Sequence, residues 1–89
     1  MVGRRRPDGK WGDDLGLTEA GDYAKATGHT QYGTVWFVKS PSGHIGMIAT
    51  HTVVEHEDGT ITVSPSILMS DGVHEQYHGW LERGVWRSA

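Results

Sequence analysis

The chain has 89 residues, no cysteine and a formal net charge of −3. This length accommodates one small domain with a modest core, and the lack of cysteine excludes disulfides and thiolate metal ligands. The longest apolar run, residues 35–38, is too short to cross a bilayer. Because no apolar segment follows the first basic residues, the sequence predicts neither a secretory signal nor a membrane partner.

Charge is distributed unevenly along the chain. Residues 1–10 carry Arg4, Arg5, Arg6 and one lysine against a single acid, whereas the rest carries four basic residues against ten acids. Glycines and a proline interrupt residues 1–16, so this stretch is expected to be an extended basic arm. We expect the arm to lie either on the acidic body, residues 17–89, or on a partner.

Residues 18–27 predict the one short helix of the chain. Thr18 can cap its start, the dipole favours Glu19 and Asp22 in the first turn, and Gly28 can end it. Four residues share one face at helical spacing: Ala20, Tyr23, Ala24 and Thr27. Gly21 costs about 1 kcal/mol relative to alanine, so the helix would depend on packing.

Extended segments follow this helix candidate. Residues 32–39 are apolar on both faces when read as a strand, which predicts a central position in a sheet. Residues 40–43 favour a turn, because Pro41 presets φ and a glycine follows two residues later. The chain then returns as an extended segment over residues 44–56.

Two glycine turns set the registers expected for the C-terminal third. An Asp-Gly pair favours a two-residue type I′ loop, which would pair Val54 with Val63. The later Glu-Arg-Gly turn favours a three-residue loop, which would pair Trp80 with Trp86. These two hairpins are the strongest local signals for strands in the sequence.

The predicted fold class is mainly β, of α+β type. We expect a small antiparallel sheet or barrel of about five or six strands, with one short N-terminal helix and an extended N-terminal arm. Residues 17–89 would form this single β-rich domain, with residues 1–16 as the arm. Trp36 and one of Trp80 and Trp86 are expected in its core.

No arrangement of reactive residues predicts an enzyme. The six histidines show no metal-ligand spacing, and nothing indicates that the acidic side chains converge. Ser64, Ser66 and Ser70 lack the strand–turn–helix elbow that exposes a nucleophilic serine. The glycines are dispersed among turns and form no phosphate-binding loop. We therefore expect no catalytic residue, no cofactor and no metal.

Two C-terminal segments carry a resemblance to known proteins. Residues 59–67 read GTITVSPSI, and residues 78–86 read HGWLERGVW. With these segments the chain resembles a group of small tailed-bacteriophage and prophage proteins of unknown function, over roughly residues 33–87. Relatives in the wider group carry Cys and His positions that suggest a metal, but this chain has no cysteine. The resemblance implies an origin in a tailed phage of an actinobacterial-type host.

The expected function is that of a non-enzymatic phage accessory protein that acts through protein–protein contacts. Its expected place is the virion, as a head-associated decoration or minor capsid protein docked by Arg4, Arg5, Arg6, Trp11 and Leu15. The partner would be a capsid protein or a second copy of the chain.

A second hypothesis places the protein in the host cytoplasm. It would be an intracellular phage binding module of the counter-defence type, which binds a host factor, a nucleotide or a nucleic acid. Three arginines on an arm would attract phosphates, but the acidic body opposes this, so nucleic acid is the less favoured partner.

Overall fold

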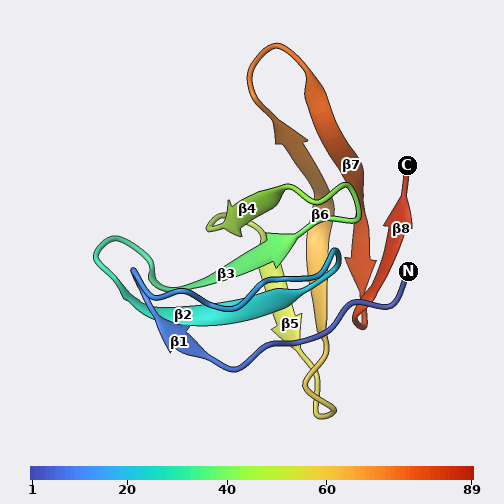
Figure 1. Cartoon of the computed structure of the whole chain (residues 1–89). Coiled ribbons are helices and arrows are strands. Elements are labelled where there is room, and N and C mark those ends of the chain that lie inside the picture. Colours follow the sequence, from blue (N-terminus) through green and yellow to red (C-terminus); the bar gives the residue numbers. More distant parts are fainter.

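Two four-stranded β-sheets make up the chain in the computed structural model, which describes all of residues 1–89 (Figure 1). The first sheet has the order β1-β2-β3-β4 and consists of β1 (Gly9–Lys10), β2 (Tyr23–His29), β3 (Gly33–Lys39) and β4 (Ile45–Ile48). The second has the order β5-β6-β7-β8 and consists of β5 (Thr52–Glu55), β6 (Ile61–Ser70), β7 (Glu75–Glu82) and β8 (Val85–Ser88). The structure holds no helix that could cross a membrane.

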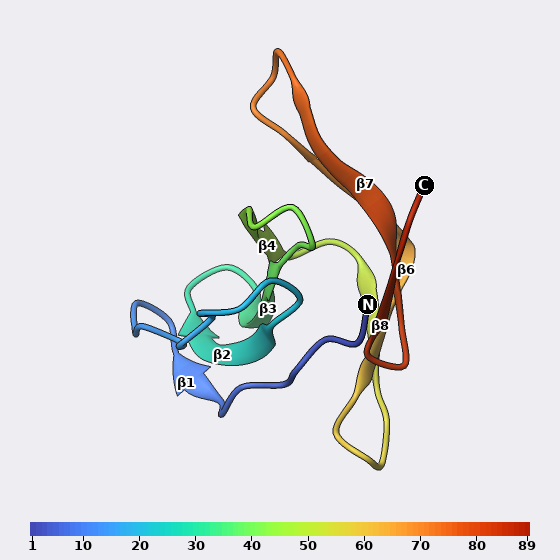
Figure 2. The same ribbon diagram turned by 45° about the vertical axis from the view of Figure 1, so that its right-hand side comes forward.

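The hydrophobic core lies between the two sheets, which Figure 2 shows as separate layers. Alternation along the strands places it there, because successive side chains point to opposite faces. On β3, Trp36 and Val38 point inward while Phe37 points outward, and on β6 Ile61 and Val63 point inward. Eleven buried residues form the core cluster: Tyr23, Trp36, Val38, Ile48, Ile61, Val63, Ile67, Met69, Tyr77, Leu81 and Trp86.

The helix predicted for residues 18–27 is wrong, and so are the α+β class and the single sheet or barrel of five or six strands. The chain is all-β, with eight strands in two sheets. Gly21 has φ of 95°, which ends any helical path, and the chain from Tyr23 onward is strand β2. Strand pairing with β3 sets Tyr23 opposite Val38 and turns the tyrosine into the core, where it is 1% exposed. The helical periodicity was weak, and this long-range pairing outweighs it.

The register predicted for the first glycine hairpin is also wrong. The loop has three residues, with Gly59 at φ of 87°, and Val53 rather than Val54 stands opposite Val63. The Asp58 carboxylate supports this loop, because its Oδ1 accepts hydrogen bonds from the Thr60 backbone N–H at 3.0 Å and from the Thr60 hydroxyl. Val53 packs on the core as a result, and Val54 faces outward.

The last hairpin shows the opposite error, since a two-residue loop replaces the predicted three-residue one. Arg83 and Gly84 have φ of 46° and 76°, as a type I′ turn requires. Leu81 then stands opposite Trp86, and Trp80 opposite Arg87 instead of Trp86. This register buries Trp86 and leaves Trp80 on the outer face, so the expectation that Trp36 and one of this pair lie in the core is confirmed.

Residues 1–10, which we call the N-terminal segment, run from the second sheet to the first. Val2 forms an antiparallel bridge with Val85 of β8, and the Trp86 backbone N–H donates to the Met1 carbonyl at 2.7 Å. Arg5 then forms a parallel bridge with Tyr23, and β1 pairs parallel with β2. The segment therefore pairs with the edge of each sheet in turn (Figure 1).

The indole of Trp86 adds a buried link between the sheets. Its Nε1–H donates to the Gly21 carbonyl at 2.9 Å, across 65 positions in sequence. Removing one partner of a buried hydrogen bond leaves the other group with no hydrogen bond to water or to protein, which costs about 1–3 kcal/mol of stability.

We predict that Trp86→Phe lowers the free energy of unfolding by about 1–3 kcal/mol, because the Gly21 carbonyl loses its donor. Urea denaturation followed by circular dichroism measures the change. Trp80→Phe is the matched control, since the Trp80 indole N–H makes no hydrogen bond within the chain and the ring lies on the outer face. Equal losses in the two variants would contradict the assignment of this link.

Candidate functional site

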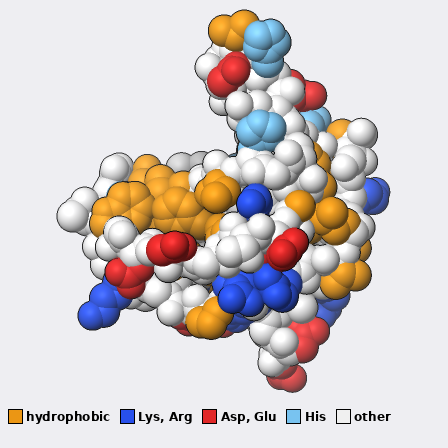
Figure 3. All heavy atoms as spheres, in the orientation of Figure 1, with side chains coloured by type: hydrophobic (Ala, Val, Ile, Leu, Met, Phe, Trp, Pro, Cys, Tyr) orange, Lys and Arg blue, Asp and Glu red, His pale blue; other side chains and the backbone are white.

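The outer face of the first sheet carries three exposed hydrophobic side chains around a half-buried one, Phe37. We call this group the apolar surface: Trp11, Phe37, Ile45 and Met47. Phe37 and Met47 are direct neighbours across β3 and β4. Trp11 is 45% exposed, Ile45 58% and Met47 42%. Figure 3 shows hydrophobic side chains gathered over this part of the molecule. Neighbouring exposed hydrophobic side chains of this kind are a feature of interaction sites.

Stacking holds Trp11 on this face. Its backbone N–H donates to the Thr27 carbonyl at 2.7 Å, which continues the pairing of β1 with β2. Its ring stacks on Phe37 with centroids 5.9 Å apart and meets the edge of His29 at 4.3 Å. The His29 Nδ1 accepts from the backbone N–H groups of residues 31 and 32, which fixes the ring that Trp11 contacts.

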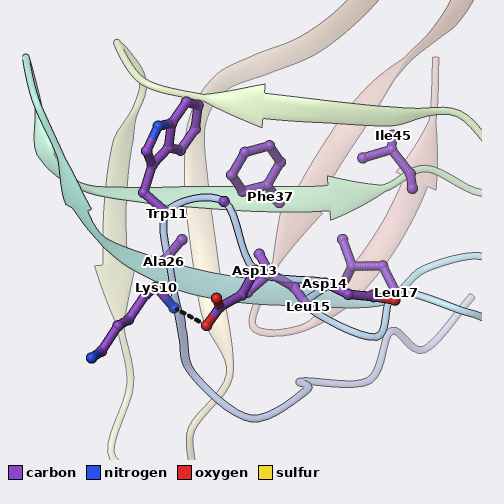
Figure 4. Close-up of a pocket in the computed structure, with 10 residues that line it drawn as sticks. Lys10, Trp11, Asp13, Asp14, Leu15, Leu17, Ala26, Phe37 and Ile45 are labelled. Carbon is purple, nitrogen blue, oxygen red and sulfur yellow. Dashed lines mark hydrogen bonds between the residues drawn. The ribbon is translucent and has the colours of Figure 1, made fainter.

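A pocket of about 440 Å³ opens beside Trp11, between residues 10–17 and the sheet (Figure 4). Six of its ten lining residues are hydrophobic: Trp11, Leu15, Leu17, Ala26, Phe37 and Ile45. Asp13 and Asp14 also line it, but each carboxylate accepts a backbone hydrogen bond within its own turn, from Lys10 at 3.0 Å and from Gly16 at 2.8 Å. The pocket is therefore suited to an apolar group and holds no pair of residues for acid–base chemistry.

The predicted docking residues divide into two groups. Trp11 and Leu15 line the open pocket, whereas two of the arginines make ion pairs within the chain. Arg4 meets Asp22 with its Nη2 3.2 Å from Oδ2, and Arg5 meets Glu55 with its Nη1 3.0 Å from Oε2. The Arg6 side chain makes no hydrogen bond, and its Nε is buried without an acceptor.

Arg5 belongs to a charged cluster that covers the core tryptophan Trp36. Its guanidinium carbon lies 5.0 Å from the ring centroid, and the Lys25 ammonium lies 5.7 Å from it. Glu55 accepts from both cations, and its hydrogen bonds with Lys25 and Arg5 hold the pKa of that carboxyl below its usual value. Because Glu55 comes from β5 and Lys25 from β2, the cluster connects the two sheets.

Serine and histidine side chains meet on the second sheet without forming a catalytic arrangement. His78 Nε2 lies 3.1 Å from Ser66 Oγ, and His51 Nε2 lies 2.9 Å from the Ser66 carbonyl oxygen. No carboxylate is hydrogen-bonded to His78, so the third member that orients a base in a triad is lacking. No group of three or more His, Asp or Glu side chains is placed to hold a metal ion.

The sequence did not identify Phe37, Ile45 and Met47 as surface residues. Phe37 lies in a strand that is apolar on both faces, a pattern typical of burial on both sides. Only the sheet order shows that β4 is an edge strand beside Phe37, so no signal in the sequence marked this surface.

Comparisons with protein-family models, curated proteins and solved structures found no match. Function therefore has to be inferred from the residues of this chain.

The Arg4–Asp22 pair predicts a specific pH dependence of stability. Burial alone would raise the pKa of Asp22, but its hydrogen bonds with Arg4 and with the Glu19 N–H outweigh burial and hold that pKa below the usual value. A carboxyl with a lower pKa in the folded state stabilises the fold above its unfolded pKa of about 4, and this contribution is lost as pH falls through the folded pKa.

We therefore expect Asp22→Asn to lower the free energy of unfolding by about 1–2 kcal/mol at pH 7, with the difference from wild type shrinking as the pH falls below 4. Chemical denaturation over a pH series measures this. Glu57→Gln serves as the control because Glu57 is exposed and forms no ion pair. A difference that stays constant from pH 7 to pH 2 would refute the assignment.

Proposed function

We propose that the chain is a non-enzymatic accessory protein of a tailed bacteriophage that acts through protein–protein contacts. Its place on the virion is the head, as a decoration or minor capsid protein. The apolar surface is the observation that supports the contact function, since three large hydrophobic side chains there remain more than two-fifths exposed: Trp11, Ile45 and Met47. The resemblance of residues 59–67 and 78–86 to phage proteins supports the origin.

The site has the general composition of a protein-binding surface. Its centre combines a tryptophan with a pocket that can receive an apolar side chain of the partner. Charged groups lie at the rim, where Lys10, Asp13 and Asp14 border the pocket and can remain partly hydrated. A partner that covers this face would bury Trp11 and Phe37 together, because the two rings are already stacked.

The ion pairs of the N-terminal segment make nucleic acid a weaker candidate partner. Arg4 and Arg5 already face Asp22, Asp8 and Glu55, so phosphates would have to compete with these carboxylates. Only Arg6 of the three arginines has no acidic partner within hydrogen-bonding distance. The net charge of −3 also opposes a polyanion.

Co-sedimentation with particles of the phage that encodes the chain tests this function. We expect the wild-type protein to sediment with particles and Trp11→Ala to bind at least about tenfold more weakly, as for an anchor residue worth more than 1.4 kcal/mol. Val73→Ala is the matched control, because Val73 is 82% exposed but lies in the turn between β6 and β7. The proposal fails if wild type does not sediment, or if Trp11→Ala binds as well as the control.

A further inference from the structure

Strand β4 has one edge that pairs with β3 and one that pairs with nothing. The hydrogen bonds of Lys39 show which groups lie on the free edge. The Lys39 N–H donates to the Asp22 carbonyl at 2.7 Å, and its carbonyl accepts from the Gly21 N–H at 2.6 Å, so both point away from β4. Lys39 stands opposite Ile45, and in an antiparallel ladder such a pair directs the backbone groups of both residues outward.

The same alternation applies two residues further on, where Phe37 stands opposite Met47. Ile45 and Met47 therefore direct two N–H donors and two carbonyl acceptors to the free edge. No group of the chain outside β4 and its ladder with β3 bonds to them. The outer edge of β8, by contrast, is occupied by the N-terminal segment through the bridge of Val2 with Val85.

Apart from its short length of four residues, nothing in β4 protects this edge. Its sequence, Ile-Gly-Met-Ile, contains no charged residue and no proline, and its register with β3 shows no bulge. Natural proteins usually block exposed edges by one of these means, because an open edge recruits another strand. An open, apolar edge beside an apolar surface is therefore suited to strand addition.

A slot of about 220 Å³ lies along β4, between this strand and the β6–β7 hairpin. In Figures 1 and 2 the hairpin rises beside β4 and extends beyond it. Ten residues line the slot: Ile45, Gly46, Met47, Ile48, His51, Ile67, Leu68, Met69, Ser70 and Gln76. None of them is Asp, Glu, Lys or Arg, so a charged side chain placed here would lose water without gaining an ionic partner.

We propose that the free edge of β4 and this slot receive an extended, uncharged segment of the partner protein, which adds to the first sheet as a fifth strand. The proposal rests on the function proposed above and names the chemistry of the partner. Backbone groups of the segment would bond to Ile45 and Met47. Alternate side chains would lie beside the apolar surface on one face and against Ile67 and Met69 on the other.

A random ten-residue peptide library, selected on the purified full chain, tests the chemistry of the segment. We expect enriched peptides to be uncharged and apolar at every second position. Each enriched peptide is then N-methylated one amide at a time. Methylation should weaken binding at least tenfold at alternate amides, and less than twofold at the amides between them, because only one set faces β4. A flat N-methylation profile, or a library that yields no binder, overturns the proposal.

Two variants locate the binding site on the chain. Met47→Pro removes one edge donor at a position where an edge strand tolerates proline, and it should weaken peptide binding at least tenfold. Leu68→Ala is the control, because it changes the slot but keeps the backbone groups of the β4 edge. It should weaken peptide binding less than Met47→Pro does. Hydrogen exchange provides a readout without mutation: bound peptide should slow the amides of Ile45 and Met47. Unchanged exchange at both amides overturns the proposal.

The outcomes separate this proposal from the proposed function. If Trp11→Ala abolishes particle binding but no peptide protects β4, strand addition is wrong and the apolar surface remains the docking site. If peptides bind as described but wild type does not sediment with particles, the virion role is wrong and strand addition stands. A wild-type dimer that Met47→Pro dissociates would show that a second copy occupies the edge, and this would also overturn the proposal.

Discussion

Backbone pairing of the N-terminal segment with both sheets is the constraint on which the rest of the structure depends. The segment bonds to β8 through Met1 and Val2 and to β2 through Arg5, so it spans the boundary between the two layers. Burial of apolar side chains drives the layers together but does not fix how they are aligned. Directional bonds fix it: the two edge pairings and the Trp86 indole on the Gly21 carbonyl.

The apolar surface is a consequence of the same path. After β1 the chain crosses the outer face of the first sheet, where Trp11 stacks on Phe37 and Leu15 closes one side of the pocket. Loss of the edge pairing would release these residues together with the segment. Contacts with the proposed partner would therefore be coupled to the stability of the fold through residues 1–17. Arg4 and Arg5 contribute to the stability of the fold, since they pair with carboxylates of the chain itself.

The sequence was sufficient for the features that local chemistry controls, and insufficient where distant contacts decide. The β-rich composition, the central strand containing Trp36 and the positions of the glycine turns follow from alternation and turn residues. The loop types do not, because Asp-Gly fits both a two-residue loop and a three-residue loop. In the first hairpin, the Asp58 carboxylate accepts a hydrogen bond from Thr60 within a three-residue loop. In the last hairpin, the Thr62 hydroxyl accepts one from the Arg83 N–H in a two-residue loop.

The helix prediction failed for a similar reason, since only pairing with β3 shows that Tyr23 faces the core. The apolar surface escaped notice because an outward Phe37 looks the same in sequence as a buried one.

Amide hydrogen exchange in the wild-type chain tests the central claim, that the N-terminal segment is part of the fold. The N–H groups of Gly3 and Arg6 in this segment, and of Trp11 directly after it, donate to carbonyls of residues 84, 23 and 27. We predict that these three amides exchange with the same opening free energy as the core amides of β6, because releasing the segment requires unfolding of the whole molecule. Exchange of the three at the rate of an unstructured peptide, with β6 still protected, would contradict this account.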